Sequence, residues 1–276
     1  MKISLNSPSK ELLKIEPIDS GIEYINKLFY YVDFEESENA KLKFLGGYPR
    51  GAVINIIGEA DTGKSLLCQT AIVANSVKGM KSVYVSVENP SSYVSMALRR
   101  IAFAKKINYQ NILNNVKILD ISGNYGLANN IDNFFKEFYQ VAKGFDICVF
   151  DSVSGLYENR EVMARYVVRR IFQISKNLKL TCFLISQKRE ESPFSSRSAG
   201  GLAISHIADC NIILSKIIIS SPIERKIYNS EIGDVVRIFR IDGCRLCGHS
   251  SKNHFFKINE FGLIVFSPKK NNSKDE

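Results

Sequence analysis

One segment of the sequence has the residue types and spacing that bind phosphate. Residues 58–65 follow the pattern G-x-x-x-x-G-K-S. Glycines let the backbone N–H groups of such a loop turn toward phosphate oxygens, and the N-terminus of a following helix adds partial positive charge. Lys64 would reach the β- and γ-phosphates, and the Ser65 hydroxyl would hold Mg²⁺. We therefore expect a nucleoside triphosphate with Mg²⁺, bound by Gly58, Glu59, Ala60, Asp61, Thr62, Gly63, Lys64, Ser65 and Leu66.

Three polar residues elsewhere in the chain each stand at the end of an apolar segment. Their side chains are suited to phosphoryl transfer. Asp151 follows the apolar residues 147–150 and would bind Mg²⁺ together with Ser65. Glu88 would orient the attacking water or accept its proton. Gln187 could sense the γ-phosphate and act with Glu88 and Lys64 as the catalytic group. The alternatives are a helix N-cap or turn for Asp151 and a solvated strand end for Glu88.

The apolar pattern predicts elements that would bring these residues together. Strands are expected at 52–57, 82–88, 116–121, 147–150 and 181–185, and helices from residue 66 and over 91–107, 127–143 and 160–178. Such alternation indicates an α/β fold with a mostly parallel sheet flanked by helices. The closely spaced strands 211–214, 235–239 and 263–266 indicate antiparallel additions at the C-terminal edge. Ligands bind at the carboxyl ends of parallel strands, where the loop, Glu88, Asp151 and Gln187 would meet.

Length and composition favour one large domain. The chain has 276 residues, of which 45% are hydrophobic, and this content excludes global disorder. We expect an ATPase-type core over 46–268, a flexible charged tail over 269–276, and a cover segment over 1–45 with helical structure at 21–31. A surface loop with a few anchors is an equal alternative for that first segment. No apolar run approaches the length of a membrane span, and the start lacks a secretory signal, so a cytoplasmic location is expected.

The order of these motifs resembles the RecA/RadA/KaiC superfamily of P-loop ATPases. The lead-in Phe44-Leu-Gly-Gly-Tyr-Pro-Arg-Gly51 is similar to that of single-domain KaiC-like proteins, and the resemblance covers roughly residues 45–266. It implies ATP as the nucleotide, a RecA-like core, and a homo-oligomeric ring or filament with ATP at the subunit interfaces.

Two departures from the family pattern affect the expected turnover. KaiC-like domains often carry two adjacent glutamates where this chain has Glu88 followed by Asn89. Near the end, Arg240 fits the first position of a basic motif that reaches the neighbouring subunit's phosphate, but Asp242 stands where the family has arginine. An aspartate cannot stabilise negative charge on phosphate. Either Arg245 replaces it, or activation by the neighbour is weak.

A polar loop after Gln187 offers a DNA-binding interpretation. It lies where RecA and RadA proteins contact DNA, and Lys188, Arg189 and Arg197 could contact phosphates while Phe194 stacks on bases. The net charge of +9 favours an acidic partner such as single- or double-stranded DNA. Two glutamates within the loop oppose this interpretation. The alternative is a surface loop that links the site to a neighbouring subunit.

Cys244 and Cys247 form a C-x-x-C pair, with His249 and His254 nearby as further candidate zinc ligands. Only one residue separates Cys247 from His249, and no second C-x-x-C is present, so a reduced or incidental pair is favoured over zinc. A thioredoxin-type role is less favoured, because the pair follows a strand instead of opening a helix.

Three functions agree with these observations. The first is a slowly hydrolysing KaiC-like ATPase that acts through conformational change on a partner protein or oligomer. The second is a RadA/RecA-like DNA-binding recombination or repair paralogue, which the loop after Gln187 favours. The third is a non-hydrolysing nucleotide switch, which Asn89 and Asp242 favour.

Overall fold

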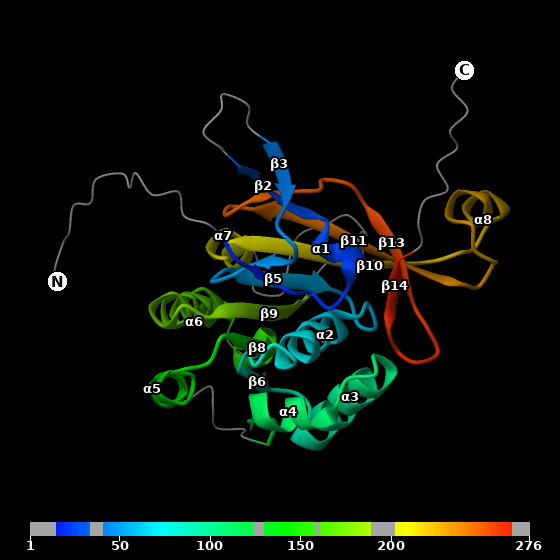
Figure 1. Ribbon diagram of the computed structural model, residues 1–276. Coiled ribbons are helices and arrows are strands. Elements are labelled where there is room, and N and C mark those ends of the chain that lie inside the picture. The colour runs from blue at the N-terminus through cyan, green and yellow to red at the C-terminus, as the bar shows by residue number, and fades with distance from the viewer. Residues whose placement is uncertain (1–14, 34–40, 124–129, 158–160, 189–201, 267–276) are drawn as a thin grey trace.

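A nine-stranded sheet forms the centre of the molecule (Figure 1). The computed structural model describes residues 15–33, 41–123, 130–157, 161–188 and 202–266. The strands of this sheet are β5 (Val53–Gly58), β6 (Ser82–Ser86), β7 (Val116–Asp120), β8 (Ile147–Asp151), β9 (Thr181–Gln187), β10 (Cys210–Ile218), β11 (Val235–Cys244), β13 (His254–Ile258) and β14 (Ile264–Phe266). Their order across the sheet is β14-β13-β11-β10-β5-β9-β8-β6-β7.

The sheet is parallel from β10 to β7 and antiparallel from β10 to β14. This arrangement confirms the predicted fold class and the antiparallel additions at the C-terminal edge. β5 lies between β10 and β9, and all six of its residues are buried. A strand covered on both faces needs a nearly continuous apolar sequence, which is what residues 52–57 provide.

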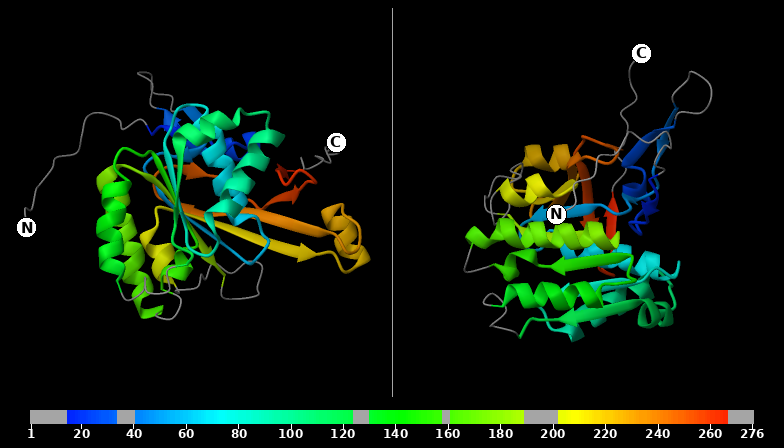
Figure 2. Two further views of the ribbon diagram at one scale, coloured as in Figure 1. Left: turned by 90° about the horizontal axis from the view of Figure 1, so that it is seen from below. Right: turned by 90° about the vertical axis from the view of Figure 1, so that its left-hand side faces the viewer.

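Helices cover both faces of the sheet (Figures 1 and 2). One face carries α2 (Lys64–Ser76), α3 (Ser91–Ala104) and α4 (Tyr109–Asn115), and the other carries α5 (Ile131–Val141), α6 (Ala164–Leu178) and α7 (Leu202–Ile207). The two hydrophobic cores follow the two-residue period of the strands: Ile54 and Ile56 pack under α2, whereas Val53 packs under α6. The carboxyl end of β5 and the start of α2 are thereby held between two packed layers.

The first described residues differ from the helix predicted over 21–31. Only α1 (Glu23–Asn26) is helical, and the residues that follow form a strand, β2 (Phe29–Asp33). That strand lies in a three-stranded sheet with β3 (Lys41–Phe44) and β12 (Gly248–His249), and β1 (Pro17–Ile18) pairs with β4 (Tyr48–Pro49). The prediction was wrong because aromatic and β-branched residues at 29–32 favour a strand once pairing partners are present, here β3 on one side and β12 on the other. The proposed boundary at residue 46 stays a prediction.

The C-terminal half contains elements that the sequence pattern did not reveal. β10 and β11 are longer than the predicted strands 211–214 and 235–239, and together they form an arm that extends beyond the sheet and ends in α8 (Pro222–Tyr228) (Figure 2). α4 and β13 were also not predicted. Residues 216–218 pair with residues 235–237, and this pairing supplies hydrogen-bond partners for the backbone N–H and C=O groups of the arm. The tip of the arm adds few buried side chains to the core.

Candidate nucleotide-binding site

The loop between β5 and α2 is held in shape by its own residues. Gly63, the N-cap residue just before α2, has a φ of +92°, a backbone conformation that favours glycine. A Cβ at Gly58 would lie 2.7 Å from the carbonyl oxygen of Leu214, so this position also requires glycine. The buried Thr62 donates its hydroxyl hydrogen to the carbonyl of Glu59 at 2.8 Å. The two glycines of the motif therefore have different structural reasons. Gly63 adopts a left-handed backbone conformation, and the backbone of Gly58 lies too close to that of Leu214 to leave room for a side chain.

Lys64 lies over the same loop. Its Nζ donates to the carbonyl oxygens of Gly58 at 2.9 Å and of Glu59 at 2.7 Å. Burial lowers the pKa of the Lys64 ammonium group, and the nearby carboxylates of Asp151 and Glu88 oppose that shift. The lysine thus points back along the loop, where it can contact a phosphate held by the loop's N–H groups.

Asp151 and Ser65 meet beside Lys64. Asp151 ends β8 with 7% of its surface exposed, and its carboxylate is hydrogen-bonded to the hydroxyls of Tyr84 and Ser65. Burial raises the pKa of Asp151, and the two hydroxyl donors partly oppose this shift. A hydroxyl and a carboxylate oxygen are ligands that Mg²⁺ accepts, so the pair fits the predicted metal position. Its location beside the phosphate loop also fits a metal that contacts phosphates.

Tyr84 was not predicted as part of this site. It lies in the middle of the buried strand β6, and Gln69 donates to its hydroxyl oxygen at 3.4 Å. A buried tyrosine hydroxyl needs a hydrogen-bond partner, and this requirement is the sequence signal that could have identified it. Its partner, however, is 67 residues away in the chain.

Glu88 lies next to the end of β8. The strand that was predicted to reach Glu88 ends at Ser86, and the N–H of Val87 then donates to the carbonyl of Asp151 at 2.8 Å. The Ser152 hydroxyl donates to the carboxylate of Glu88, which is otherwise exposed. The structure therefore brings Glu88 to the strand end that carries Asp151, with its carboxylate open to solvent.

Gln187 and Lys188 lie beside the phosphate loop. Gln187 is the last residue of β9 and pairs in register with Gly58. Its backbone N–H donates to the Ser154 hydroxyl at 3.3 Å. Lys188 donates its backbone N–H to the carbonyl of Gly58 at 3.2 Å, and its Nζ lies 3.8 Å from a carboxylate oxygen of Glu59. The side chain of Lys188 therefore contacts the protein's own loop. The other residues of the predicted DNA loop, Arg189, Phe194 and Arg197, lie outside the described residues.

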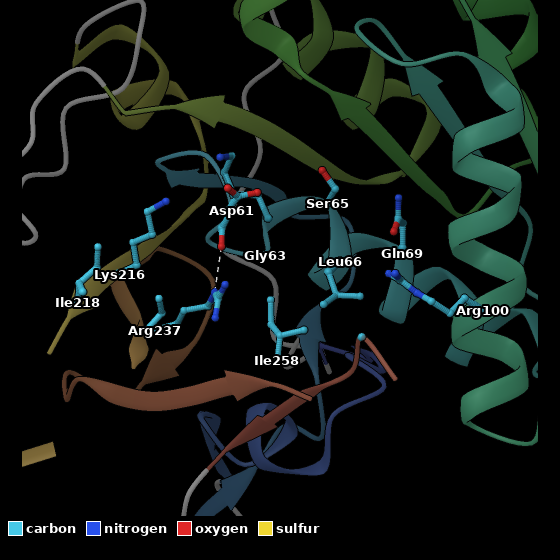
Figure 3. A pocket seen from close by; sticks show the side chains of 13 residues that line it. Asp61, Gly63, Ser65, Leu66, Gln69, Arg100, Lys216, Ile218, Arg237 and Ile258 are labelled. Carbon is cyan, nitrogen blue, oxygen red and sulfur yellow. Dashed lines mark hydrogen bonds between the residues drawn. The ribbon is translucent and has the colours of Figure 1, made fainter. Parts of the chain in front are cut away.

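A pocket of about 560 Å³ adjoins the loop (Figure 3). Residues of the phosphate loop line one side, and Arg100 of α3, Lys216 of β10, Arg237 of β11 and Ile258 of β13 line the rest. Arg237 donates through Nε to the carbonyl of Asp61 at 2.9 Å, a bond drawn in Figure 3. Pockets of this size suit small-molecule ligands, and basic side chains beside apolar ones suit a phosphate ester that carries an apolar ring. The residues beyond the loop were not predicted, because each belongs to an element distant from the motif.

The two arginines predicted to act on a neighbouring subunit have partners in their own chain. Arg240 forms an ion pair with Asp242 at 2.8 Å. Arg245 donates to the carbonyl of His206 at 2.7 Å. Arg245 follows Cys244, the end of β11 that lies far from the phosphate loop.

The candidate zinc ligands are not assembled as a metal site. Over the residues that the structure describes, no group of three or more histidine, cysteine or acidic side chains is placed to hold a metal ion. His254 contacts the hydroxyls of Tyr24 at 3.0 Å and Ser250 at 2.9 Å. Nδ1 of His249 lies 3.2 Å from the carbonyl of Ser250.

Comparison with known proteins identifies the family. The family model described as "ATPase: KaiC" matches residues 18–271. The chain belongs to the KaiC family of ATPases. This result confirms the resemblance inferred from the motifs, and the mixed sheet is the RecA-like fold that the resemblance implied.

Two relatives of this KaiC family member extend the comparison. A KaiC-like protein of the archaeon Pyrococcus horikoshii has a similar fold, with a TM-score of 0.68 and 21% identity over 92% of this chain and 100% of that one. The archaeal flagellar ATP-binding protein FlaH of Methanocaldococcus jannaschii is 34% identical over 125 residues, 41% of this chain. The match spans about half of that curated relative, 49% of its length. Among the described residues, no helix is both long and apolar enough to cross a bilayer.

Proposed function

We propose that this KaiC family member binds ATP with Mg²⁺ and hydrolyses it slowly, and that the resulting conformational change acts on a partner protein or on its own oligomer. The observation that carries the proposal is the contact between Ser65 and Asp151 beside Lys64. These three side chains come from α2 and β8, and their chemistry matches a triphosphate and its cation.

Each side chain of the site has a distinct task in this proposal. The N–H groups of residues 59–65 and the ammonium of Lys64 hold the phosphates, for which Lys64 exchanges its bonds to the carbonyls of Gly58 and Glu59. Ser65 and Asp151 hold Mg²⁺, which neutralises charge on the phosphate oxygens. Glu88, exposed and steadied by the Ser152 hydroxyl, orients the attacking water and accepts its proton. Gln187 transmits the state of the γ-phosphate to the residues after β9.

Slow turnover is supported by the pairing of Arg240 with Asp242. Removal of a positively charged donor from a phosphoryl-transfer site costs a large part of the rate. The Arg240 guanidinium already bonds to a carboxylate of its own chain, which reduces its availability to a neighbouring phosphate.

A partner protein or oligomer is favoured over DNA. Lys188 contacts Glu59 of the phosphate loop, and its side chain is shielded from solvent, so it offers no charge to a nucleic acid.

Nucleotide binding tests the first part of the proposal. Titration calorimetry of ATP with Mg²⁺ should show an affinity for Lys64→Ala that is at least about tenfold weaker, because a hydrogen bond to a charged group contributes about 1.5–3 kcal/mol. The exposed Lys117 on β7 supplies the matched control, and Lys117→Ala should bind as the unaltered protein does. Equal affinity of Lys64→Ala and Lys117→Ala would refute the assignment.

Hydrolysis tests the second part. Glu88→Gln should keep ATP affinity and lose about 10²–10⁴-fold in rate, the usual contribution of a general base. An equal, very low rate in both proteins would instead support a non-hydrolysing switch. Stimulation of the rate by single-stranded DNA would support the recombination paralogue and direct mutagenesis to residues 188–206.

A further inference from the structure

Three cysteine thiols meet where β11 ends. Cys210 begins β10 and pairs across the antiparallel ladder with Cys244, the last residue of β11. Cys247 follows in the next turn, and its Sγ lies 3.6 Å from that of Cys244. All three are free thiols, and Cys210 is hydrogen-bonded to Cys244 as well. Cys148 and Cys182 are also hydrogen-bonded neighbours, but both are buried in the core, whereas Cys244 and Cys247 are partly exposed.

This thiol cluster is separate from the nucleotide pocket. Cys210 pairs with Ile54 near the start of β5, whereas the phosphate loop leaves the other end of that strand at Gly58. The cluster therefore lies at the opposite end of these strands from the phosphate loop. Cys244 and Cys247 are partly exposed, in contrast to Cys210, which has no exposed surface. Small molecules in solution can reach the C-x-x-C pair without passing the nucleotide site.

The pKa values of the two partly exposed thiols are shifted in opposite directions. Hydrogen bonds from the thiols of Cys210 and Cys247 lower the pKa of Cys244, and the bond to Cys244 raises the pKa of Cys247. The thiolate is the nucleophilic form of cysteine, and C-x-x-C motifs commonly lower the pKa of one member. These directions favour Cys244 as the attacking sulfur, and the Sγ of Cys247, 3.6 Å away, is placed to attack it in turn.

We propose that Cys244 and Cys247 form a redox-active dithiol that closes to a disulfide by exchange with a low-molecular-weight disulfide. The Cys244 thiolate attacks one sulfur of the oxidant, forms a mixed disulfide and releases the first thiolate. Cys247 then loses its proton and attacks the Cys244 sulfur, which releases the second. Two protein thiols are oxidised to one disulfide, and one small disulfide is reduced to two thiols.

The position of the pair gives this modification a structural consequence. β12 follows Cys247 directly and pairs with β2, with the Tyr30 hydroxyl donating to the carbonyl of His249 at 2.7 Å. The N–H of Ser250 also donates to the carbonyl of Leu28 at 2.9 Å. A bridge from Cys244 to Cys247 fixes the turn from which β12 leaves the main sheet, and it thereby ties the N-terminal strands to the end of β11.

The chain carries a convenient assay for this bridge. Trypsin cleaves after Arg245, between the two cysteines, so they fall on separate peptides, 241–245 and 246–252. The full chain is incubated with oxidised glutathione, unfolded in acid, alkylated with N-ethylmaleimide and digested without reductant. We expect mass spectrometry to find the two peptides joined by a disulfide, and Cys68, Cys148 and Cys182 alkylated.

A variant separates the two steps. In Cys247→Ser the second attack is removed, so glutathione should remain attached to peptide 241–245. Alkylated Cys244 and Cys247 in the oxidised wild-type chain would overturn the proposal, whether or not the variant folds. A bridge from Cys244 to Cys210, on peptide 198–216, would overturn it too. So would thiols that react only after treatment with a zinc chelator, because that result indicates a bound metal in place of a redox pair.

Discussion

Asp151 combines a proposed role as a Mg²⁺ ligand with near-complete burial. Its carboxylate is flanked by the hydroxyls of Tyr84 and Ser65 and by the ammonium of Lys64, yet burial still raises its pKa. The surroundings therefore stabilise the ionised form less than water does. Residues that serve a ligand commonly carry such a cost in stability, since the charge they need is matched only when the ligand is bound.

This balance predicts the effect of removing the charge. An acid whose pKa is raised on folding destabilises the native state above the folded pKa, and the penalty disappears below the unfolded value near 3.8. Asp151→Asn without nucleotide should therefore raise the thermal midpoint at pH 7 by a few degrees, about 2–4 °C for each kcal/mol. The gain should shrink as the pH falls toward 4, and differential scanning calorimetry over that range measures it.

Asp132 provides the control for this prediction. It also accepts a hydrogen bond from a tyrosine hydroxyl, that of Tyr166, but at an exposed position between α5 and α6. Asp132→Asn should not raise the thermal midpoint at pH 7. If Asp151→Asn is no more stable than the unaltered protein at pH 7, burial is not the dominant cost at this carboxylate.

At the scale of elements, α8 depends on its own ends for stability. None of its seven residues, all of them described, is buried, so packing contributes little to holding it. Ser221 and Glu224 form a capping box: the Ser221 hydroxyl accepts from the N–H of Glu224, and the Glu224 carboxylate accepts from the N–H of Ser221. Pro222 at the first helical position adds a preset backbone angle.

Loss of the cap should therefore act locally. Ser221→Ala removes an interaction that contributes about 1 kcal/mol at a helix N-terminus, so amide exchange over residues 222–228 should become about fivefold faster. Hydrogen exchange with mass spectrometry provides the measurement, and Ser251→Ala in an exposed turn provides the control. The global thermal midpoint and ATP affinity should not change. A lower global midpoint would instead mean that the arm unfolds together with the sheet.

At the scale of the whole molecule, the position of the pocket bears on how the chain assembles. The family resemblance implies a ring or filament with ATP between subunits. The arm of β10, β11 and α8 (Figure 2) continues from the ends of β10 and β11, where Lys216 and Arg237 pair and line the pocket. A ligand held at such an edge can be covered by a neighbouring chain.

We therefore expect ATP to promote association. Light scattering after size exclusion should give a mass near 31.1 kDa without nucleotide and a multiple of it with ATP and Mg²⁺. Lys64→Ala should remain at the lower mass in both conditions. If saturating ATP leaves the unaltered protein at 31.1 kDa, the nucleotide site is completed within one chain.

The parts of the molecule that could be predicted are those encoded by neighbouring residues. The phosphate loop, the strand before it and the order of strands and helices up to β9 follow from local periodicity and turn residues. The helix expected over 21–31 was wrong because residues 29–33 pair with two other strands: β3, about ten residues later, and β12, more than two hundred residues later. The extent of the arm depends on pairing in the same way.

The sequence by itself determined the family, the parallel sheet and the loop that we propose holds the phosphates, because these depend on contiguous residues and on a fixed strand period. Only the tertiary structure decided that Tyr84 bonds to Asp151, that Lys188 turns toward Glu59, and that Arg237 reaches the carbonyl of Asp61. Such contacts depend on the register between strands and on the packing of side chains from distant elements. Neither quantity can be read from the composition or periodicity of a single segment.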